Sequence, residues 1–300
     1  MKTIVVFGAS GQQGGGVVRA LKAQGMFRVR AVSRDAARLA GVGADEVVSA
    51  DLTRPETLGP AFAGAHGAFV VTNFWEGPGI DALAQGRAAV EAARAAGVQH
   101  FIWSTLPNVA MLSKNAFDVP HFTQKARVDE LVSAAGFPAY TFVEAPFYFQ
   151  NLIGQMTPQP QADGSSAWSL PMAPEPRVMH GGDISELGSV VAGAFARPDR
   201  VGAGQHLAHA GDLLSWNDII GTLKDLGHTI GFQRVPDEMF DTFFPQAREL
   251  RQTMNYFEAH TYFGPDADEK IALAREVATA PPTSFADWAR VNFVKDAIAQ

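Results

Sequence analysis

The sequence predicts an α/β protein built on a doubly wound parallel sheet, with a smaller, mostly helical domain at its C-terminal end. Three observations support this prediction. Short β-branched segments alternate with longer Ala-, Arg- and Leu-rich segments through the first half of the chain. Several of the short segments are apolar on both faces, as strands buried between two layers of helices should be. A glycine-rich loop directly follows the first of them.

The predicted strands and helices follow one another regularly along the chain. We expect strands at Thr3–Phe7, Arg28–Ser33, Glu46–Ser49, 68–72, 101–104 and 139–143. Segments of helical length and period lie between them at 16–24, 81–96 and 121–135. This alternation predicts parallel strands with helices on both faces of the sheet.

The alternation stops near Pro146. Residues 155–176 are rich in Pro, Gln, Ser and Gly, which predicts a loop that includes a short hairpin around Trp168. A helical pattern resumes over residues 183–196 and begins with acidic side chains, which are favourable at a helix start. Residues 206–209 predict one more strand, which returns to the sheet.

The domain organisation follows from this change of pattern. The chain has 300 residues, enough for one large domain or two intimate ones. From Trp216 to the end it is mostly helical in pattern and rich in Phe, Trp and Met. We therefore expect a dinucleotide-binding domain over residues 1–152 and a smaller C-terminal domain over residues 153–300. A segment near 178–210 is expected to return to the first domain.

Composition excludes several classes of protein. The net charge of −7, without a cluster of Lys and Arg, argues against direct contact with nucleic acid. The absence of cysteine excludes disulfides, thiolate metal sites and cysteine nucleophiles. The first apolar run is too short for a signal peptide, and no stretch approaches the roughly 18 apolar residues of a membrane span. We therefore expect a cytoplasmic protein that does not enter a membrane.

The glycine-rich loop carries the strongest functional signal. Gly8, Gly11 and Gly14 form a G-x-x-G-x-x-G pattern between the first strand and the first helix, and Ser10, Gln12 and Gln13 lie within it. In this position glycine lets the backbone turn sharply and approach a pyrophosphate, which the N–H groups of the helix start then bind. The alternative is a glycine-rich turn without a ligand. We interpret the loop as the dinucleotide site of a Rossmann-type domain.

The end of the second strand indicates which dinucleotide is bound. An NAD-binding domain usually has Asp or Glu there, but this chain has Ser33, followed by Arg34 and, one turn later, Arg38. Guanidinium groups suit the 2′-phosphate of NADP(H), because Arg binds phosphate in a bidentate way. Asp35 is a counter-argument, although it comes one or two residues late. The alternative is that both arginines are solvated surface charges.

Two further strand ends should face the cofactor, because open α/β sheets bind ligands at the carboxyl ends of their strands. Asp51 and Leu52 follow the third strand and could flank the adenine. Asp51 could equally cap the following helix. Thr72, Asn73 and Phe74 end the fourth strand.

Several segments together carry a resemblance to a known family. They are Val5-Val6-Phe7-Gly8, Phe27-Arg28-Val29-Arg30, Val71-Thr72-Asn73-Phe74-Trp75-Glu76, His121-Phe122-Thr123-Gln124-Lys125, Pro146-Phe147-Tyr148-Phe149-Gln150-Asn151-Leu152 and Phe244-Pro245-Gln246-Ala247-Arg248-Glu249-Leu250. On these segments the sequence resembles the NmrA-like family, an atypical branch of the short-chain dehydrogenase/reductase superfamily.

The resemblance implies that NADP(H) lies in a cleft between a Rossmann domain and a smaller C-terminal domain. It implies cofactor contacts from Gly8, Ser10, Gly11, Gln12, Gln13, Arg34, Thr72, Asn73, Phe74, Lys125, Tyr148 and Asn151. A family member also looks like a redox sensor that changes partners with the NADPH level. The resemblance therefore extends to a regulatory role.

The superfamily's catalytic signature, Tyr-x-x-x-Lys, is incomplete in this chain. The matching stretch has His121 four residues before Lys125, which places both on one helix face. Lys125 can still hold the nicotinamide ribose. His121 could act as a general acid, but the like charge of Lys125 should lower its pKa. The alternative, which we favour, is that His121 lines the cleft or caps the helix after Pro120.

Other candidate groups carry a weaker signal. Ser104 and Thr105 end the fifth strand, where hydroxyls would lie near the nicotinamide, and Tyr148 could approach the substrate or the nicotinamide. The aromatic residues expected around the cleft are Phe74, Trp75, Phe147, Tyr148 and Phe149. Such a cleft would suit a flat or apolar small molecule. His206 and His209 lack metal-ligand spacing, and no Gly-x-Ser-x-Gly occurs.

These observations leave two functions open. The missing Tyr and the resemblance favour an NADP(H)-binding sensor or regulator with weak or no dehydrogenase activity, which would have a protein partner. The alternative is an NADPH-dependent reductase of a small quinone, imine or carbonyl compound, in which the cofactor supplies the hydride. A homodimer is compatible with either function.

Overall fold

A seven-stranded parallel sheet forms the centre of the computed structural model, which describes residues 1–72, 81–161, 163 and 165–293. Its strands are β1 (Thr3–Phe7), β2 (Arg28–Ser33), β3 (Glu46–Ser49), β4 (Gly67–Val70), β5 (His100–Thr105), β6 (Ala139–Glu144) and β11 (Ala203–Ala208). They lie in the order β11-β6-β5-β4-β1-β2-β3. The chain order reverses between β1 and β4, so a ligand crevice is expected at their carboxyl ends. The predicted doubly wound sheet is confirmed.

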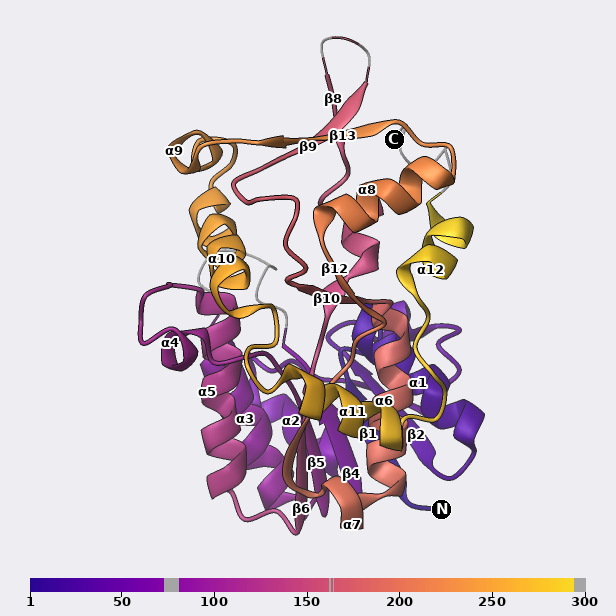
Figure 1. The fold of residues 1–300 in the computed structure, drawn as a ribbon. Coiled ribbons are helices and arrows are strands. Elements are labelled where there is room, and N and C mark those ends of the chain that lie inside the picture. The colour runs from indigo at the N-terminus through magenta and orange to yellow at the C-terminus, as the bar shows by residue number, and fades with distance from the viewer. Residues whose placement is uncertain (73–80, 162, 164, 294–300) are drawn as a thin grey trace.

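Helices cover both faces of this sheet (Figure 1). On one face α1 (Gln12–Gln24) and α6 (Leu187–Ala196) share a core with inward residues such as Ile4 and Val6. On the other face α2 (Leu58–Phe62), α3 (Ala82–Ala95) and α5 (Pro120–Ala134) cover the alternate residues, such as Val5 and Phe7. The short helices between the strands are η1 (Ala36–Leu39), η2 (Pro55–Thr57), α4 (Val109–Leu112), η5 (Ile184–Glu186) and α7 (Pro198–Val201).

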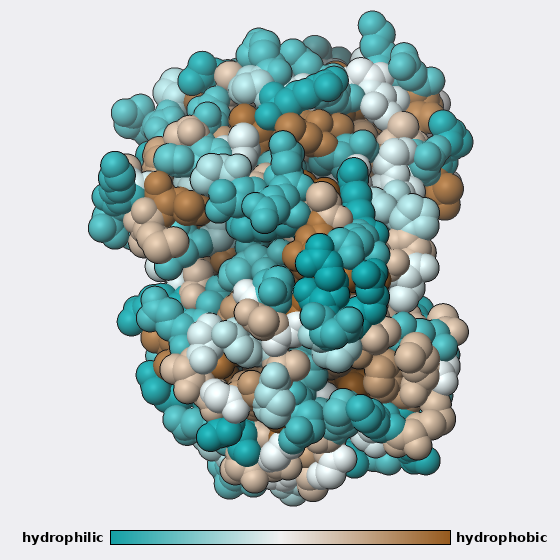
Figure 2. Space-filling model, turned by 60° about the horizontal axis from the view of Figure 1, so that its bottom comes forward, coloured by the Kyte–Doolittle hydropathy of each residue, from teal (hydrophilic) through white to brown (hydrophobic). Residues whose placement is uncertain are grey.

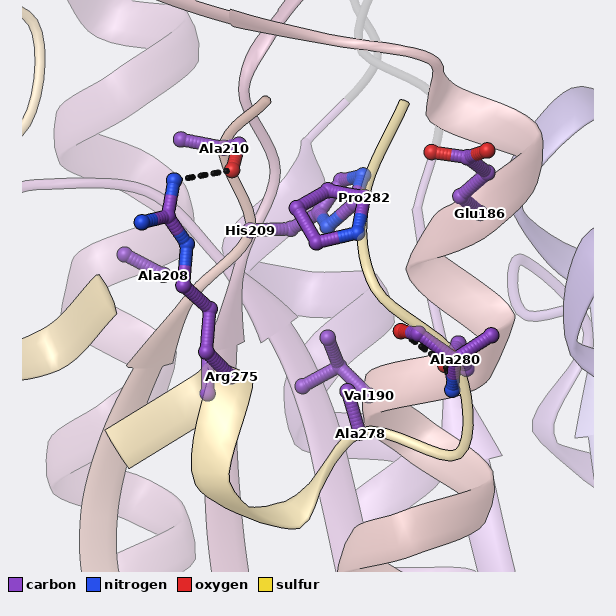
Figure 3. Close-up of a pocket in the computed structure, with 11 residues that line it drawn as sticks. Glu186, Val190, Ala208, His209, Ala210, Arg275, Ala278, Ala280 and Pro282 are labelled. Atoms are coloured by element: carbon purple, nitrogen blue, oxygen red, sulfur yellow. Dashed lines mark hydrogen bonds between the residues drawn. The ribbon is translucent and has the colours of Figure 1, made fainter. Parts of the chain in front are cut away.

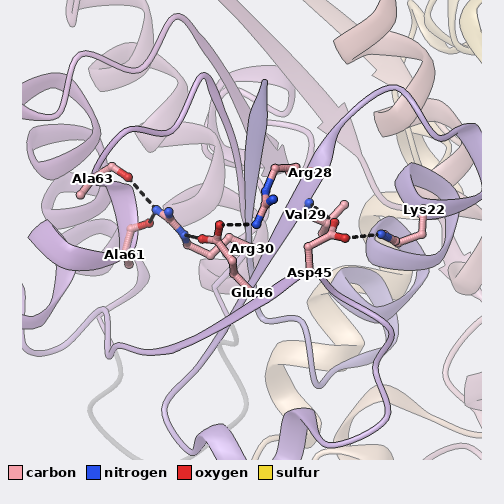
Figure 4. Close-up of polar contacts among 8 residues, drawn as sticks. All are labelled: Lys22, Arg28, Val29, Arg30, Asp45, Glu46, Ala61 and Ala63. Atoms are coloured by element: carbon pink, nitrogen blue, oxygen red, sulfur yellow. Dashed lines mark hydrogen bonds and ion pairs between the residues drawn. The ribbon is translucent and has the colours of Figure 1, made fainter. Parts of the chain in front are cut away.

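The outer edge of the sheet is held by ion pairs at the amino ends of its last two strands. Figure 4 shows the Glu46 carboxylate bound by Arg28 and Arg30, at 3.0 and 2.7 Å. Arg30 also donates to the backbone oxygens of Ala61 and Ala63. These contacts hold the pKa of Glu46 below its usual range, chiefly through the hydrogen bond from Arg30. These contacts stabilise the amino ends of β2 and β3, opposite the carboxyl ends where a ligand crevice is expected.

A second lobe stands above the carboxyl ends of the strands (Figure 1). One small sheet joins β7 (Phe147–Tyr148), β10 (Met179–Gly182) and β12 (Asp212–Leu214), and another joins β8 (Gln159–Pro160), β9 (Ser166–Leu170) and β13 (Ile230–Arg234). Its helices are η4 (Phe149–Ile153), α8 (Trp216–Asp225), α9 (Asp237–Phe240), α10 (Ala247–His260) and α12 (Phe285–Asn292). A separate core fills this lobe, and in it the rings of Trp168 and Trp216 lie tilted to each other with their centroids 5.0 Å apart.

Two C-terminal segments return to the large sheet. Strand β11 pairs with β6, and α11 (Ala267–Val277) adds Ala274 and Val277 to the core beneath α6. Strands β10, β12 and β13 fall outside the strands expected from the sequence. They are short, and the glycines of β10 and the half-exposed residues of β13 do not produce the alternation that identifies a strand.

The surface shows no large apolar area on the face drawn in Figure 2. Hydrophilic side chains cover most of this face, and apolar residues form small scattered groups among them. Among the described residues, no helix combines the length and the apolarity that crossing a membrane requires.

Candidate cofactor and active site

The glycine loop forms a cradle in which two backbone segments nearly touch. Gly8 has a φ of +67°, in the left-handed region that favours glycine. A Cβ added at Gly14 would lie 2.2 Å from the carbonyl oxygen of Gly8, a distance that no side chain can adopt. The amide of Gly11 closes the turn by donating to the same oxygen at 2.9 Å. Both outer glycines are therefore required by the backbone itself.

The first helix presents its amino end to this cradle. Gly11 is the N-cap of α1 and offers no side chain to the first amides, and the first turn holds no acidic residue. An anion at this end would meet backbone N–H groups and the positive end of the helix dipole. Helix α1 packs closely against η5 and α6. A Cβ at Gly16 would lie 2.3 Å from the Ser185 oxygen of η5, and a Cβ at Gly188 of α6 would lie 2.2 Å from the Gly16 oxygen. The residues present fit a pyrophosphate.

The end of β2 places two arginines beside this loop. Ser10 and Ser33 bring their hydroxyls within 3.4 Å of each other, so the strand end touches the loop. Arg34 and Arg38 are exposed. The Asp35 carboxylate accepts from the Ala37 amide at 2.9 Å and caps η1, so this carboxylate is turned towards its own backbone. The corner suits a phosphate better than ribose hydroxyls.

The residues that follow β3 and β4 have different surroundings. The Asp51 carboxylate accepts hydrogen bonds from the amide and the hydroxyl of Thr53, which makes a local turn rather than a helix cap. Leu52 packs against the core. Thr72 is buried behind the carboxyl end of β4. Asn73 and Phe74, and also Trp75, lie outside the described residues.

Lys125 lies buried at the carboxyl edge of the sheet. Its ammonium group donates to the backbone oxygen of Thr72 at 2.7 Å and to the Thr72 hydroxyl at 3.1 Å. It also lies over the Trp103 ring, 5.8 Å from the centroid. Burial lowers the pKa of Lys125 from 10.5 to about 8, and the nearby Asp129 acts in the opposite direction. An ammonium group with this pKa stays mostly protonated at neutral pH and can donate.

His121 is bound to a residue of the other lobe. Its Nδ1 lies 2.7 Å from Glu249 Oε1, and its backbone N–H donates to the same oxygen at 3.1 Å. Its pKa is lowered, chiefly by burial, whereas Glu249 raises it and Lys125 contributes a smaller lowering. The expected direction is therefore correct, but burial rather than Lys125 is the main cause. Sequence reasoning missed Glu249, because 128 residues separate the partners.

Replacing Glu249 with glutamine tests this contact. Glu249 stabilises the imidazolium form, so Glu249→Gln should lower the pKa of His121 further. A histidine titration followed by NMR measures it, and His206, which pairs with Glu144, provides an internal control. An unchanged or raised pKa of His121 would show that the pair does not form.

A hydrogen-bonded chain joins three separate segments at the same edge. The Gln13 amide nitrogen donates to the Tyr148 hydroxyl at 2.6 Å, and the Ser104 hydroxyl donates to the Gln13 amide oxygen at 2.7 Å. Gln13 comes from the first turn of α1, Ser104 from β5 and Tyr148 from β7. Burial raises the pKa of Tyr148 above its ordinary value of 10. The sequence predicted each residue near the cofactor, but not their connection.

Comparison with known proteins agrees with this arrangement. The sequence profile of the NmrA-like family matches residues 1–289. The chain belongs to the NmrA-like family. The family expected from the sequence is thereby confirmed.

Relatives of this NmrA-like chain have different descriptions. An NmrA-like family domain-containing protein of Dictyostelium discoideum is 33% identical over 208 residues, which are 66% of this chain and 68% of that protein. An NmrA-like family domain-containing oxidoreductase of Aspergillus hancockii is 29% identical, and the match covers 93% of this chain and 91% of that one.

The fold matches solved structures of NmrA, a negative transcriptional regulator. The structure in complex with NADP aligns with a TM-score of 0.81 at 22% identity, covering 99% of this chain and 97% of that one. The structure in complex with NAD aligns with a TM-score of 0.82 over the same shares. At this identity the likeness establishes the fold.

The aromatic cluster expected around the cleft of this NmrA-like protein is only partly present. Phe149 is fully buried in the core of the C-terminal lobe, where its ring centroid lies 5.2 Å from that of Phe285. The expectation that Phe149 lines the cleft is therefore wrong. The short helix η4 turns it inward at the point where β7 ends. Phe147 and Tyr148 are half-buried, as is Asn151 in η4.

His206, within β11, and His209, directly after it, serve the fold. His206 binds the buried Glu144 at 2.9 Å, together with Lys270, and within the described residues no cluster suits a metal ion. His209 lines a small pocket between α6, β11 and α11, where Figure 3 shows Arg275 directed at the Ala210 oxygen. This pocket shares no residue with the candidate cofactor site.

Proposed function

We propose that this chain binds NADP(H) at the carboxyl edge of its large sheet. The observation that carries this proposal is the close approach of Gly14 to the Gly8 oxygen, which leaves no room for a side chain, beside the exposed start of α1. The loop amides would hold the pyrophosphate, and Arg34 with Arg38 the 2′-phosphate. Lys125 would hold the nicotinamide ribose. The complex of the related regulator NmrA with NADP supports the proposal.

We further propose that the bound cofactor reduces a small conjugated acceptor, such as a quinone or another carbonyl compound. The reduced dinucleotide supplies the hydride when it is bound. Two groups at the carboxyl edge of the sheet support this function, the Lys125 ammonium and the hydrogen-bonded chain of Ser104, Gln13 and Tyr148. Polar groups at this edge would stabilise the negative charge that an acceptor gains on reduction. The description of relatives as oxidoreductases also supports it.

The second candidate is the sensor or regulator favoured by the sequence. The contact between His121 and Glu249 supports it, because it joins the helix that carries Lys125 to α10 of the other lobe. Apolar side chains are exposed just before α10, at Met239, Phe243 and Phe244, where a protein partner could bind.

One experiment separates the two candidates. Purified protein and NADPH are offered a panel of quinones, aldehydes and imines, and the absorbance near 340 nm is followed. Steady oxidation supports the reductase. Tight NADPH binding without oxidation, together with protection from protease by NADPH, supports the sensor and overturns the reductase.

Cofactor choice is tested by Arg34→Ala. Loss of charge-assisted hydrogen bonds to the 2′-phosphate, about 1.5–3 kcal/mol, should weaken NADPH binding by roughly 10- to 100-fold. NADH binding should change little, because NADH lacks this phosphate. Titration of NAD(P)H fluorescence measures both affinities. Arg290→Ala, at a surface ion pair of the C-terminal lobe, is the matched control. Equal weakening of both cofactors would refute the assignment.

A further inference from the structure

The proton donor of the proposed reduction is not at the position where the superfamily's signature has it. His121 replaces the Tyr of that signature, and its Nδ1 is engaged with Glu249. Burial lowers its pKa, so that the imidazole is mostly neutral at pH 7. A neutral imidazole is a weak acid. A hydride transfer that leaves negative charge on oxygen therefore needs another donor, if the enzyme supplies one.

Tyr148 lies at the required place. Its hydroxyl is 2.6 Å from the Gln13 amide nitrogen, and Gln13 directly follows Gln12 at the start of α1, behind the glycine loop. Strand β7 holds the tyrosine at the junction of the lobes, where Tyr148 pairs with Gly182 of β10. The phenol is thus fixed beside the segment that binds the dinucleotide, and not out in the C-terminal lobe.

The partners of Tyr148 leave its own proton available. A tyrosine hydroxyl has one proton to donate, and it also accepts hydrogen bonds. Here it accepts from Gln13, whose amide oxygen is held in turn by the buried Ser104 hydroxyl. The Ser104 contact fixes which end of the amide faces Tyr148. No described residue accepts the Tyr148 proton, so the O–H bond can point towards an acceptor oxygen.

We propose that Tyr148 donates the proton in the reduction of a carbonyl or quinone acceptor, and that Gln13 and Ser104 are positioning residues that hold its hydroxyl. The proposal rests on the reductase function proposed above. The C=O carbon of a carbonyl acceptor, or a ring carbon conjugated with a C=O group of a quinone, gains a hydride. The displaced π electron pair moves to the carbonyl oxygen, and the Tyr148 O–H bond breaks to protonate that oxygen. The dinucleotide is oxidised by two electrons, the acceptor is reduced by two, and water reprotonates the phenolate.

The catalytic test compares Tyr148→Phe with Tyr140→Phe, which removes a hydroxyl from β6 outside the site. General acid catalysis contributes about 100- to 10,000-fold, so Tyr148→Phe should lower kcat by at least about 100-fold. The Kd for NADPH should stay within roughly threefold, since the lost group acts on the acceptor. Ser104→Ala should lower kcat by a smaller factor. Unchanged kcat in Tyr148→Phe overturns the proposal.

A spectroscopic test does not depend on turnover. The chain has four tyrosines, so phenolate formation can be followed by absorbance near 295 nm as the pH is raised. The oxidised nicotinamide is positively charged and should favour an adjacent phenolate. We expect one tyrosine to ionise at lower pH with NADP⁺ than with NADPH. This difference should be lost in Tyr148→Phe, reduced in Ser104→Ala and kept in Tyr140→Phe.

The outcomes distinguish this proposal from the one on which it rests. If the protein binds no NADPH, the proposed cofactor function fails. If it binds NADPH but reduces no acceptor, the reductase function fails and the cofactor proposal stands. If it reduces an acceptor but the tyrosine titration is the same with both cofactor forms, Tyr148 is not the donor and the reductase function stands.

Discussion

Replacing Gly14 with alanine is expected to abolish dinucleotide binding. The new Cβ would lie 2.2 Å from the Gly8 oxygen, 2.5 Å from the Gly8 carbonyl carbon and 2.8 Å from the Ala9 nitrogen. The first turn of α1 and the loop must therefore move apart. Because each contact from a backbone amide to a charged phosphate contributes about 1.5–3 kcal/mol, we expect NADPH affinity to fall by about 100-fold or more.

The control for this substitution is a glycine in open space. Gly221 lies in α8, and a Cβ there meets nothing within 4 Å. Alanine favours a helix over glycine by about 1 kcal/mol, so Gly221→Ala should raise the free energy of unfolding and leave NADPH binding unchanged. Fluorescence titration and thermal unfolding measure both quantities. Wild-type affinity in Gly14→Ala would mean that the loop does not hold the pyrophosphate.

Lys125→Met is expected to abolish turnover at a small cost in stability. Removing one preorganised donor from an active site typically lowers kcat by about 100- to 1,000-fold. The Thr72 oxygen loses its buried donor, which costs about 1–3 kcal/mol. The unfavourable burial of the ammonium group is relieved at the same time. These two effects oppose each other, so the free energy of unfolding should change little near pH 7.

The pH dependence of stability identifies the buried ammonium group. The pKa of Lys125 is about 8 in the folded protein, and its ordinary pKa is 10.5, so the unfolded chain binds more protons between these pH values. The wild type should therefore gain stability relative to Lys125→Met as the pH rises from 8 to 10.5, by up to about 3 kcal/mol. Denaturant unfolding of both proteins at several pH values measures this gain. If the difference in unfolding free energy between the two proteins did not change with pH, the Lys125 ammonium group would not be buried. If Lys125→Met kept its turnover, Lys125 would not belong to the active site.

The sequence by itself determined the parallel sheet and its glycine loop. Both depend on local patterns: apolar runs of strand length, helical periods between them, and three glycines within seven residues. The same holds for the family, because its motifs are contiguous segments. In the C-terminal lobe the sequence predicted the short hairpin around Trp168, which β8 and β9 form. It did not predict β10, β12 and β13, because their pairing comes from residues far apart in the chain and not from alternation.

Only the tertiary structure decided how the site is assembled. Gln13 meets Ser104 across 91 residues and Tyr148 across 135, and His121 meets Glu249 across 128. Such contacts produce no periodic pattern in the sequence, because each depends on a single side chain. The packing of strands and helices brings that side chain to the carboxyl edge of the sheet. The sequence could therefore show that the Tyr of the signature is missing, while the fold showed that Tyr148 lies beside the glycine loop.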